Sequence, residues 1–406
     1  MASLLYVLLQ LNIKNGVNTM QQKFLYFVLL AFSTLSFAQF TATTEMNSYA
    51  DDNLFRSPEP VSDVLSNIGL KLNYQPQNSE LKFYYAGTFY FYRDYSERNF
   101  LLQSLGVNAF HPFGKEERHG FYYGADFALR INGQQYDYYN YSQLYAYASL
   151  NFDLDFMFFK TGYNFRYRSY ANLPDLTNYR HYIFAQVNKS FATKTTLILE
   201  TDLGNKSFAG KEISPLYSEE EWGMRGRGRH MEQTFLPSQL SVPSMTHIVL
   251  LARVAQSIHP KVGVYVQYRK QISLTEQTDF INSTNYYQDE ELYDDPFSYE
   301  SDGVSGQFTW ILPYRAKLQI GIGAVHKNYI SEQAFVSADD SVGSGGLRTD
   351  DNRNVYVSLM KTFYFKKSFL QAVEFNLNYN YISNKSNSYW YDYHNTIFGG
   401  GISWKF

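Results

Sequence analysis

The last fourteen residues of the chain read Tyr393-His-Asn-Thr-Ile-Phe-Gly-Gly-Gly-Ile-Ser-Trp-Lys-Phe406. Taking every second residue back from the end gives Phe406, Trp404, Ile402, Gly400 and Phe398, and the other parity gives Lys405, Ser403, Gly401 and Gly399. Because successive side chains of a β-strand point to opposite faces, this segment predicts a strand with one apolar, aromatic-ended face and one small or polar face.

The same two-residue alternation recurs along the chain. It is clear in residues 68–74, 197–203, 262–268, 318–324 and 373–381, where one parity is mostly apolar and the other carries many Asn, Gln, Gly and charged residues. These stretches are also longer than the strands of roughly five or six residues that soluble proteins favour. The pattern indicates a barrel whose apolar parity faces lipid and whose polar parity lines a lumen. Closure leaves no backbone edge exposed in lipid.

The connections between these stretches alternate in length. Short turns are predicted near 75–78, 114–118, 153–155, 192–194, 259–261, 313–315 and 366–368. Longer polar connections are predicted at 51–63, 94–99, 133–141, 171–179, 209–238, 276–302, 331–352 and 383–391. Seven short and eight long connections separate sixteen strands, with fourteen or eighteen as alternatives. The predicted fold class is therefore all-β, a transmembrane antiparallel up-and-down β-barrel with short periplasmic turns and long external loops.

The closing strand resembles that of Gram-negative outer-membrane β-barrels of the porin-like superfamily, which typically ends in an aromatic residue. In that family the terminal strand is the sorting signal read by the barrel-insertion machinery. The resemblance therefore implies that Trp404 and Phe406 carry a sorting signal. It also implies an outer-membrane location with both termini periplasmic, and contact with outer-membrane lipids and lipopolysaccharide. A second copy of the chain or other envelope proteins stay open as partners.

The other end of the chain predicts a secretory signal. From Met20 the sequence runs through Lys23 and an apolar stretch at 24–32 to Ser36 and Ala38, the small residues that a signal peptidase requires. We therefore divide the chain into 1–19, an upstream extension that is not structural, 20–38, a signal peptide, and 39–406, a single barrel domain. The alternative for the first nineteen residues, a membrane helix, is disfavoured because their apolar run is short.

The composition narrows the function classes. The chain has 38 Tyr and 33 Phe, which suit a membrane interface, yet its mean hydropathy is only −0.37. It has no Cys, which excludes thiol catalysis and thiolate metal sites. The net charge of −3 provides no basic field, so nucleic acid is not an expected partner.

The predicted loop at 209–238 contains three Glu followed by Arg225, Arg227 and Arg229, spaced by glycine. Folded into the lumen, these arginines would form a constriction with a transverse field, or a clamp for an anionic ligand or a lipopolysaccharide phosphate. The alternative is a solvated external loop that neutralises its own charge. The acidic connection at 276–302 leaves calcium binding open, but it lacks the spacing of a calcium-binding loop, and we predict no metal and no cofactor.

Several charged residues on the polar parity of predicted strands are candidates for lining a pore. Basic candidates are Lys160, Arg166 and Arg168, and acidic candidates are Glu200, Asp202 and Glu374. A basic row facing an acidic row would line an ion-selective pore. Salt bridges that brace the barrel wall are the alternative.

The favoured function is a non-catalytic porin-like channel for small hydrophilic solutes, because sixteen strands enclose a lumen wide enough for water. No His neighbours a Gly-x-Ser-x-Gly elbow, and His-Glu-x-x-His is absent, so we do not expect an enzyme. The first alternative is a structural barrel subunit of a secretion or assembly complex, since inward tyrosines such as Tyr84, Tyr90 and Tyr92 would fill the bore. The second alternative is a lipid-modifying barrel enzyme.

Overall fold

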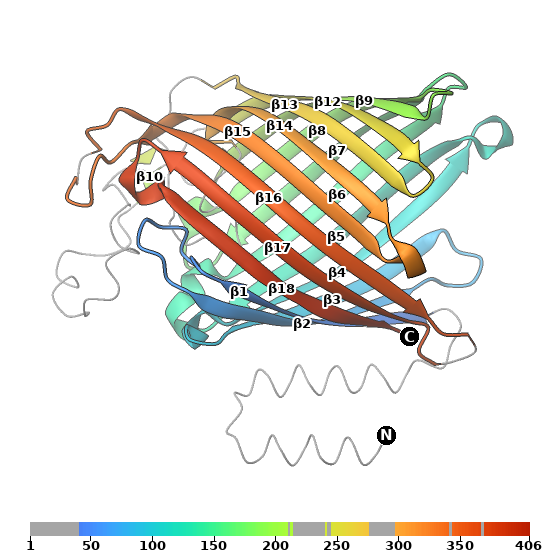
Figure 1. Cartoon of the computed structure of the whole chain (residues 1–406), viewed down its shortest axis with the longest axis horizontal. Coiled ribbons are helices and arrows are strands. Elements are labelled where there is room, and N and C mark those ends of the chain that lie inside the picture. Colours follow the sequence, from blue (N-terminus) through green and yellow to red (C-terminus); the bar gives the residue numbers. More distant parts are fainter. Residues whose placement is uncertain are drawn as a thin grey trace, which may run out of the picture.

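Sixteen long strands form one closed antiparallel barrel, as predicted (Figure 1). The computed structural model describes residues 40–209, 212–213, 240–241, 245–275, 297–340, 343–366 and 369–406. The barrel strands are β1 (Phe40–Asp51), β2 (Asp63–Tyr74), β3 (Leu81–Tyr92), β4 (Phe100–Phe113), β5 (His119–Asn132), β6 (Tyr141–Asp153), β7 (Phe158–Tyr170), β8 (Asn178–Ser190), β9 (Thr195–Phe208), β12 (Met245–His259), β13 (Val262–Ser273), β14 (Tyr299–Ile311), β15 (Lys317–Gln333), β16 (Leu347–Tyr364), β17 (Ala372–Ser386) and β18 (Tyr393–Lys405). The short strands β10 (Glu212–Ile213) and β11 (Leu240–Ser241) form a separate two-stranded sheet.

The connections contain short 3₁₀ helices. They are η1 (Ser96–Arg98), η2 (Lys115–Glu117), η3 (Gln134–Tyr139), η4 (Pro174–Leu176), η6 (Pro313–Arg315) and η7 (Tyr389–Tyr391). No helix in the described ranges is long and apolar enough to cross a membrane. The short turns gather at the end of the barrel that holds the C-terminus, and the long connections gather at the opposite end (Figure 1). We call these the short-turn end and the long-loop end.

Three connections at the long-loop end are shorter than the sequence predicted. β15 continues to Gln333 and β16 begins at Leu347, inside the predicted loop 331–352. β14 begins at Tyr299 and β17 runs to Ser386, which shortens the predicted loops 276–302 and 383–391. The polar residues here lack the apolar alternation used for prediction, but they extend the antiparallel ladder. The backbone pairs whether or not the side chains face lipid.

The apolar parity predicted for the strands lies on the outside. Ile322, Val266 and Leu377 are 62%, 60% and 52% exposed, and each lies on the predicted lipid-facing parity of its strand. Directly paired residues share a face, so the register carries this assignment around the barrel. An apolar surface of this extent suits lipid rather than water. The structure thus has the fold of the outer-membrane barrels that the closing strand resembles.

The first and last strands close the barrel. β18 pairs with β17 on one side and with β1 on the other. At the short-turn end, the Phe406 amide donates to the Ala42 carbonyl over 2.8 Å. At the long-loop end, Asn395 Nδ2 donates to Asp51 Oδ1 over 2.5 Å. Between these two contacts, Gly399, Gly400 and Gly401 pair with β1. We call this β1–β18 junction the seam.

Candidate functional site

The inward faces of β7, β8 and β9 carry a concentration of basic side chains, which we call the cationic wall. Arg166 is paired in register with Arg180, and Arg180 is paired with Lys206. These three cations therefore occupy one row across three adjacent strands. Arg168 lies one inward position nearer the long-loop end, and Lys160 lies nearer the short-turn end. Of these residues, the sequence alone indicated Arg166, Arg168 and Lys160 but not Arg180 or Lys206.

Aromatic rings and amides hold the long side chains of the cationic wall. The buried guanidinium of Arg166 donates from Nη2 to Asn178 Oδ1 over 3.1 Å. Arg168 donates from Nη2 to Gln143 Oε1 over 2.9 Å, and its Cζ lies 4.2 Å from the centroid of the Tyr141 ring. Lys206 Nζ lies 4.8 Å from the centroid of the Phe208 ring. These contacts limit the motion of the three side chains.

The predicted acidic residues Glu200 and Asp202 lie on this same wall. Glu200 shares a row with Gln186 and Lys160, and Gln186 Nε2 donates to its carboxylate. Asp202 is paired with Phe184 on one side and with Val249 on the other. The acidic residues therefore adjoin the basic ones along the wall. Glu200 and Asp202 therefore do not face the basic residues across the lumen, whereas the third predicted acidic residue, Glu374, lies on β17 at the opposite side.

The inward faces of β16, β17, β18 and β1 form a second surface, which we call the amide wall. Its asparagines are Asn47, Asn352, Asn354, Asn376, Asn378, Asn380, Asn384 and Asn395. They bond to each other and to neighbouring amides: Asn378 Nδ2 donates to Asn376 Oδ1 over 2.8 Å, and Asn47 Nδ2 donates to Asn67 Oδ1 over 3.0 Å. The predicted residue Glu374 also lies here and accepts a bond of 2.7 Å from Thr362 Oγ1.

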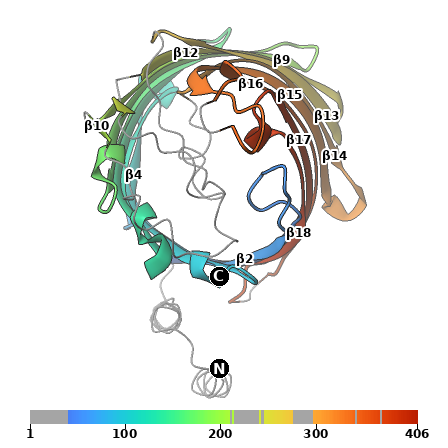
Figure 2. The same ribbon diagram turned by 90° about the vertical axis from the view of Figure 1, so that its left-hand side faces the viewer.

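The two walls lie on opposite sides of the lumen. β8 is the eighth strand around the closed barrel from β1, and β18 is the sixteenth, so half of the circumference separates them (Figure 2). The connection between β1 and β2 also lies within the ring of strands in this view, at the long-loop end. A solute in the lumen would therefore have a mainly basic wall on one side and, on the other, a wall rich in asparagine that also carries Glu374.

Inward-facing aromatic rings lie over inward-facing glycines of the neighbouring strand. A Cβ atom placed on Gly124 would lie 2.9 Å from the Tyr147 ring, and one placed on Gly162 would lie 2.7 Å from the Phe184 ring. Tyr84 covers Gly106, Tyr356 covers Gly321, Tyr182 covers Gly204 and Tyr49 covers Gly399 in the same way. Because glycine has no side chain, each ring can rest against the barrel wall instead of projecting across the bore. Of the tyrosines that favoured a filled bore, Tyr84 lies against the wall in this way, whereas Tyr90 stacks on the Phe100 ring with centroids 4.5 Å apart and Tyr92 is buried.

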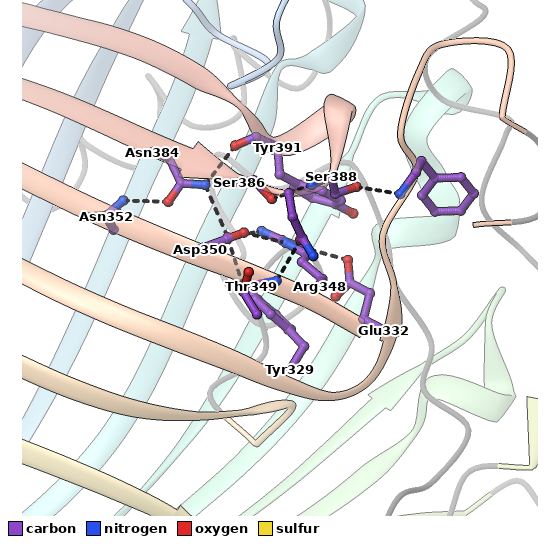
Figure 3. A network of polar contacts seen from close by, with 12 residues as sticks. Tyr329, Glu332, Arg348, Thr349, Asp350, Asn352, Asn384, Ser386, Ser388 and Tyr391 are labelled. Carbon is purple, nitrogen blue, oxygen red and sulfur yellow. Dashed lines mark hydrogen bonds and ion pairs between the residues drawn. The ribbon is translucent and has the colours of Figure 1, made fainter. Parts of the chain in front are cut away.

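A buried polar network connects β15, β16 and β17 at the long-loop end (Figure 3). Arg348 is 1% exposed, and it bonds to Glu332 Oε1 over 2.8 Å and to the Asp350 carboxylate. Its Cζ lies 3.3 Å from the centroid of the Tyr391 ring in η7. Asn384 Nδ2 donates to Asp350 Oδ2 over 3.1 Å and to the Tyr391 carbonyl over 2.7 Å. Removing one member would leave a buried charge without its partner, which costs about 3–5 kcal/mol.

Other candidates from the sequence stand as follows. Arg225, Arg227 and Arg229 lie outside the described residues, as does most of the acidic connection 276–302. Among the residues that are described, no group of three or more His, Asp or Glu could hold a metal ion. Trp404 lies on the outward parity of β18, paired with Thr44 and Val373, and the Phe406 ring lies 5.1 Å from that of Phe369. Their role in sorting stays a prediction.

Comparison with known proteins gives similarity of structure only. No protein-family model matches the chain, and no curated protein matches it. Among solved structures, it is similar to Pseudomonas aeruginosa OccK10 (OpdN), with 7% identity, a TM-score of 0.43 and coverage of 91% of this chain and 99% of that one. It is also similar to outer-membrane-expressed OmpT of Vibrio cholerae, with 12% identity, a TM-score of 0.43 and coverage of 92% of this chain and 99% of that one. With a bacterial polysaccharide outer membrane secretin it shares 8% identity, with a TM-score of 0.47 and coverage of 90% of this chain and 98% of that one. At these scores the likeness carries no functional information.

Proposed function

We propose that this chain is an outer-membrane channel that lets small hydrophilic solutes pass and catalyses no reaction. The observation that carries the proposal is the seating of inward aromatic rings on glycines, as with Phe184 on Gly162 and Tyr147 on Gly124. It keeps large side chains against the wall in a barrel of sixteen strands. Barrels of this size have room for an aqueous path.

The chemistry of the lumen supports the same proposal. Asparagine amides line one wall and basic side chains line the other, so a passing solute can exchange its bonds to water for bonds to the protein. Neither wall presents the continuous apolar surface that would favour a hydrophobic cargo. In this proposal the long-loop end is external and both termini are periplasmic. Trp404 and Phe406 then carry the sorting signal.

Electrical recording tests the channel directly. The full chain, purified from the membrane and shown to be folded by heat-modifiable migration in gel electrophoresis, is added to a planar lipid bilayer in potassium chloride. We expect discrete, reproducible conductance steps. A correctly folded barrel that gives no steps would overturn the proposal and favour a structural subunit of an envelope complex.

The location has its own test. Deletion of Phe406 removes the last aromatic residue and its bond to Ala42. We expect the truncated chain to be lost from the outer-membrane fraction, while a Phe406→Tyr chain is retained. Normal outer-membrane recovery of the truncated chain would contradict the sorting role without touching the channel proposal.

A further inference from the structure

The outer surface of the barrel carries charges at the long-loop end of β13 to β17. Lys270, Asp302, His326, Asp351 and Lys385 are paired in register, one after another, in a single row across these five strands. All five lie on the outward parity, the one that carries Val266, Ile322 and Leu377 nearer the short-turn end. The row therefore marks the edge of the apolar band that lies nearest the long-loop end, where lipid head groups begin.

Two cations in this region, Lys385 of the row and the nearby Arg353, differ from Lys270 and His326. Lys270 Nζ is paired with Asp302 Oδ1 at 3.1 Å, and His326 Nδ1 bonds to Asp351 Oδ1 at 2.8 Å. Arg353, one outward position nearer the short-turn end than Asp351, is exposed, and so is Lys385. Within the described part of the chain, neither Arg353 nor Lys385 forms an ion pair. The carboxylate of Asp351 is turned to His326 instead of to Lys385.

These two cations are close enough to act on one ligand. Asp351 is paired with Lys385, and Arg353 is paired with Ser383, so Arg353 and Lys385 are diagonal neighbours on adjacent antiparallel strands. Such neighbours lie roughly 7–8 Å apart, which long side chains can bridge. Ser383 lies between them and is paired on its other side with His394, whose Nδ1 lies 3.2 Å from the Tyr381 hydroxyl.

An unpaired cation is energetically unfavourable at a position that faces lipid. A basic side chain on the lipid face costs about 2–4 kcal/mol at the bilayer midplane and much less at the interface, where it can meet head groups. Arg353 is flanked on its own face by Val355, which faces hydrocarbon. An anion supplied by the lipid would therefore stabilise its guanidinium. A phosphate suits this role because a guanidinium binds two phosphate oxygens at once.

The rest of the outer edge shows that this charge is local. The outward residues at the long-loop ends of β3 to β6 are uncharged, and they include Phe89, Phe91, Leu101, Leu129 and Leu144. An interface that needed only general contact with head groups would show no such difference between the two sides. The cations of β16 and β17 are therefore a local feature of one side of the barrel.

We propose that Arg353 and Lys385 bind a phosphate of lipopolysaccharide, with Ser383 and His394 beside them as hydrogen-bonding groups. The acyl chains would then lie on Val355, Leu377 and Tyr379 toward the short-turn end. Lipopolysaccharide is the phosphorylated lipid of the external leaflet, so this choice rests on the outer-membrane location and external long loops proposed above. It is independent of whether the lumen conducts.

Native mass spectrometry of the full chain in mild detergent tests the site. The probe is purified bis-phosphorylated lipid A, titrated into the wild-type protein and into an Arg353→Gln/Lys385→Gln double variant. We expect one lipid A to bind the wild type, and the double variant to bind at least about tenfold more weakly, because two charge-assisted contacts are lost. Lys270→Gln is the matched control, since that cation is already paired with Asp302, and it should bind like the wild type.

Three results would overturn the proposal. They are equal binding by the double variant, equal binding of dephosphorylated lipid A by the wild type, and equal binding of phosphatidylglycerol. Arg353→Lys/Lys385→Arg keeps both charges and should retain binding, which separates loss of charge from a folding defect. Conductance of the double variant should match the wild type because both side chains point away from the lumen. A silent wild-type barrel that still binds lipid A would contradict the channel and leave this site intact.

Discussion

The cationic wall and the amide wall face each other across one lumen but are built from different side chains. On β7 to β9, Arg166, Arg180 and Lys206 carry full charges on long stems that rings and amides restrain. On β16 to β1, short asparagines bond to one another, and Gly399 and Gly401 carry no side chain at all. The charged wall is the bulkier of the two.

This difference has a physical meaning for anything that enters the lumen. Fixed charge acts over about 8–10 Å at physiological ionic strength, whereas an amide acts only at contact distance. In the proposed channel, the cationic wall would therefore draw anions toward one side of the bore. The amide wall offers donors and acceptors to solutes of either charge. The proposed channel would thus combine attraction on one side with weak, reversible bonding on the other.

The largest expected effect concerns the two faces of β17, one of the strands that form the amide wall. Leu377 and Asn378 are neighbours on β17, the first outward and the second inward. Leu377→Arg should destabilise the barrel by about 2–4 kcal/mol if it lies near the midplane. Asn378→Arg should be tolerated, because it faces the lumen. Urea-dependent folding into lipid vesicles measures both free energies. Equal losses would mean that the two faces have been assigned wrongly.

The next effect concerns the glycines under the rings, one near each wall. Gly204 lies under Tyr182, and Gly321 lies under Tyr356, with only side-chain atoms crowding the added Cβ. Gly204→Ala and Gly321→Ala should each cost about 1–3 kcal/mol through overpacking and should push a ring into the bore. Single-channel recording should show smaller conductance steps for both.

A rescue variant makes this test specific. Gly321→Ala combined with Tyr356→Ala removes the displaced ring as well, so the conductance should return to the wild-type value or exceed it. A double variant that conducts as poorly as Gly321→Ala would show that the ring is not what narrows the bore.

The third effect contrasts the charges of the two walls. Replacing Arg166, Arg180 and Lys206 together by Gln should lower the preference for anions, measured as the reversal potential under a salt gradient. At low salt we expect a change on the order of tenfold in the anion-to-cation permeability ratio. It should shrink at 1 M salt, where the screening length falls to about 3 Å. Replacing Asn376, Asn378 and Asn380 by Gln is the matched control on the amide wall and should leave the ratio unchanged.

The smallest effect lies within the cationic wall itself. Lys160 shares a row with Gln186 and Glu200, so its charge is partly balanced by a nearby carboxylate. Lys160→Gln should shift the reversal potential toward cations by less than Arg180→Gln does, and Glu200→Gln should shift it toward anions. Shifts of the same sign for Lys160→Gln and Glu200→Gln would mean that the row does not contribute to selectivity.

The strands and their two faces could be predicted because they are local properties. Alternation within residues 373–381 is enough to separate Leu377 from Asn378, and the short turns set the strand count. These features need no knowledge of which residues lie opposite each other on neighbouring strands.

The arrangement of the site depends on register, which the sequence does not display. Arg166 and Lys206 lie forty residues apart in the chain, and only the pairing of β7, β8 and β9 places them in one row with Arg180. The contact between Tyr356 and Gly321 likewise depends on the β15–β16 register. Arg348 lies inside a stretch predicted as loop, so its burial had no local indication.

The seam joins strands from the two ends of the described chain. Every other adjacent pair of strands in the barrel follows closely along the chain or across one loop, whereas Asn395 and Asp51 are 344 residues apart. Bringing two such distant points together costs about 5 kcal/mol of chain entropy by the logarithmic loop-closure relation. Contacts of this kind have the highest contact order in the molecule and tend to form slowly. Until they form, the chain is an open sheet with two bare edges, so the bonds of Ala42 and Asp51 to the last strand convert that sheet into a tube.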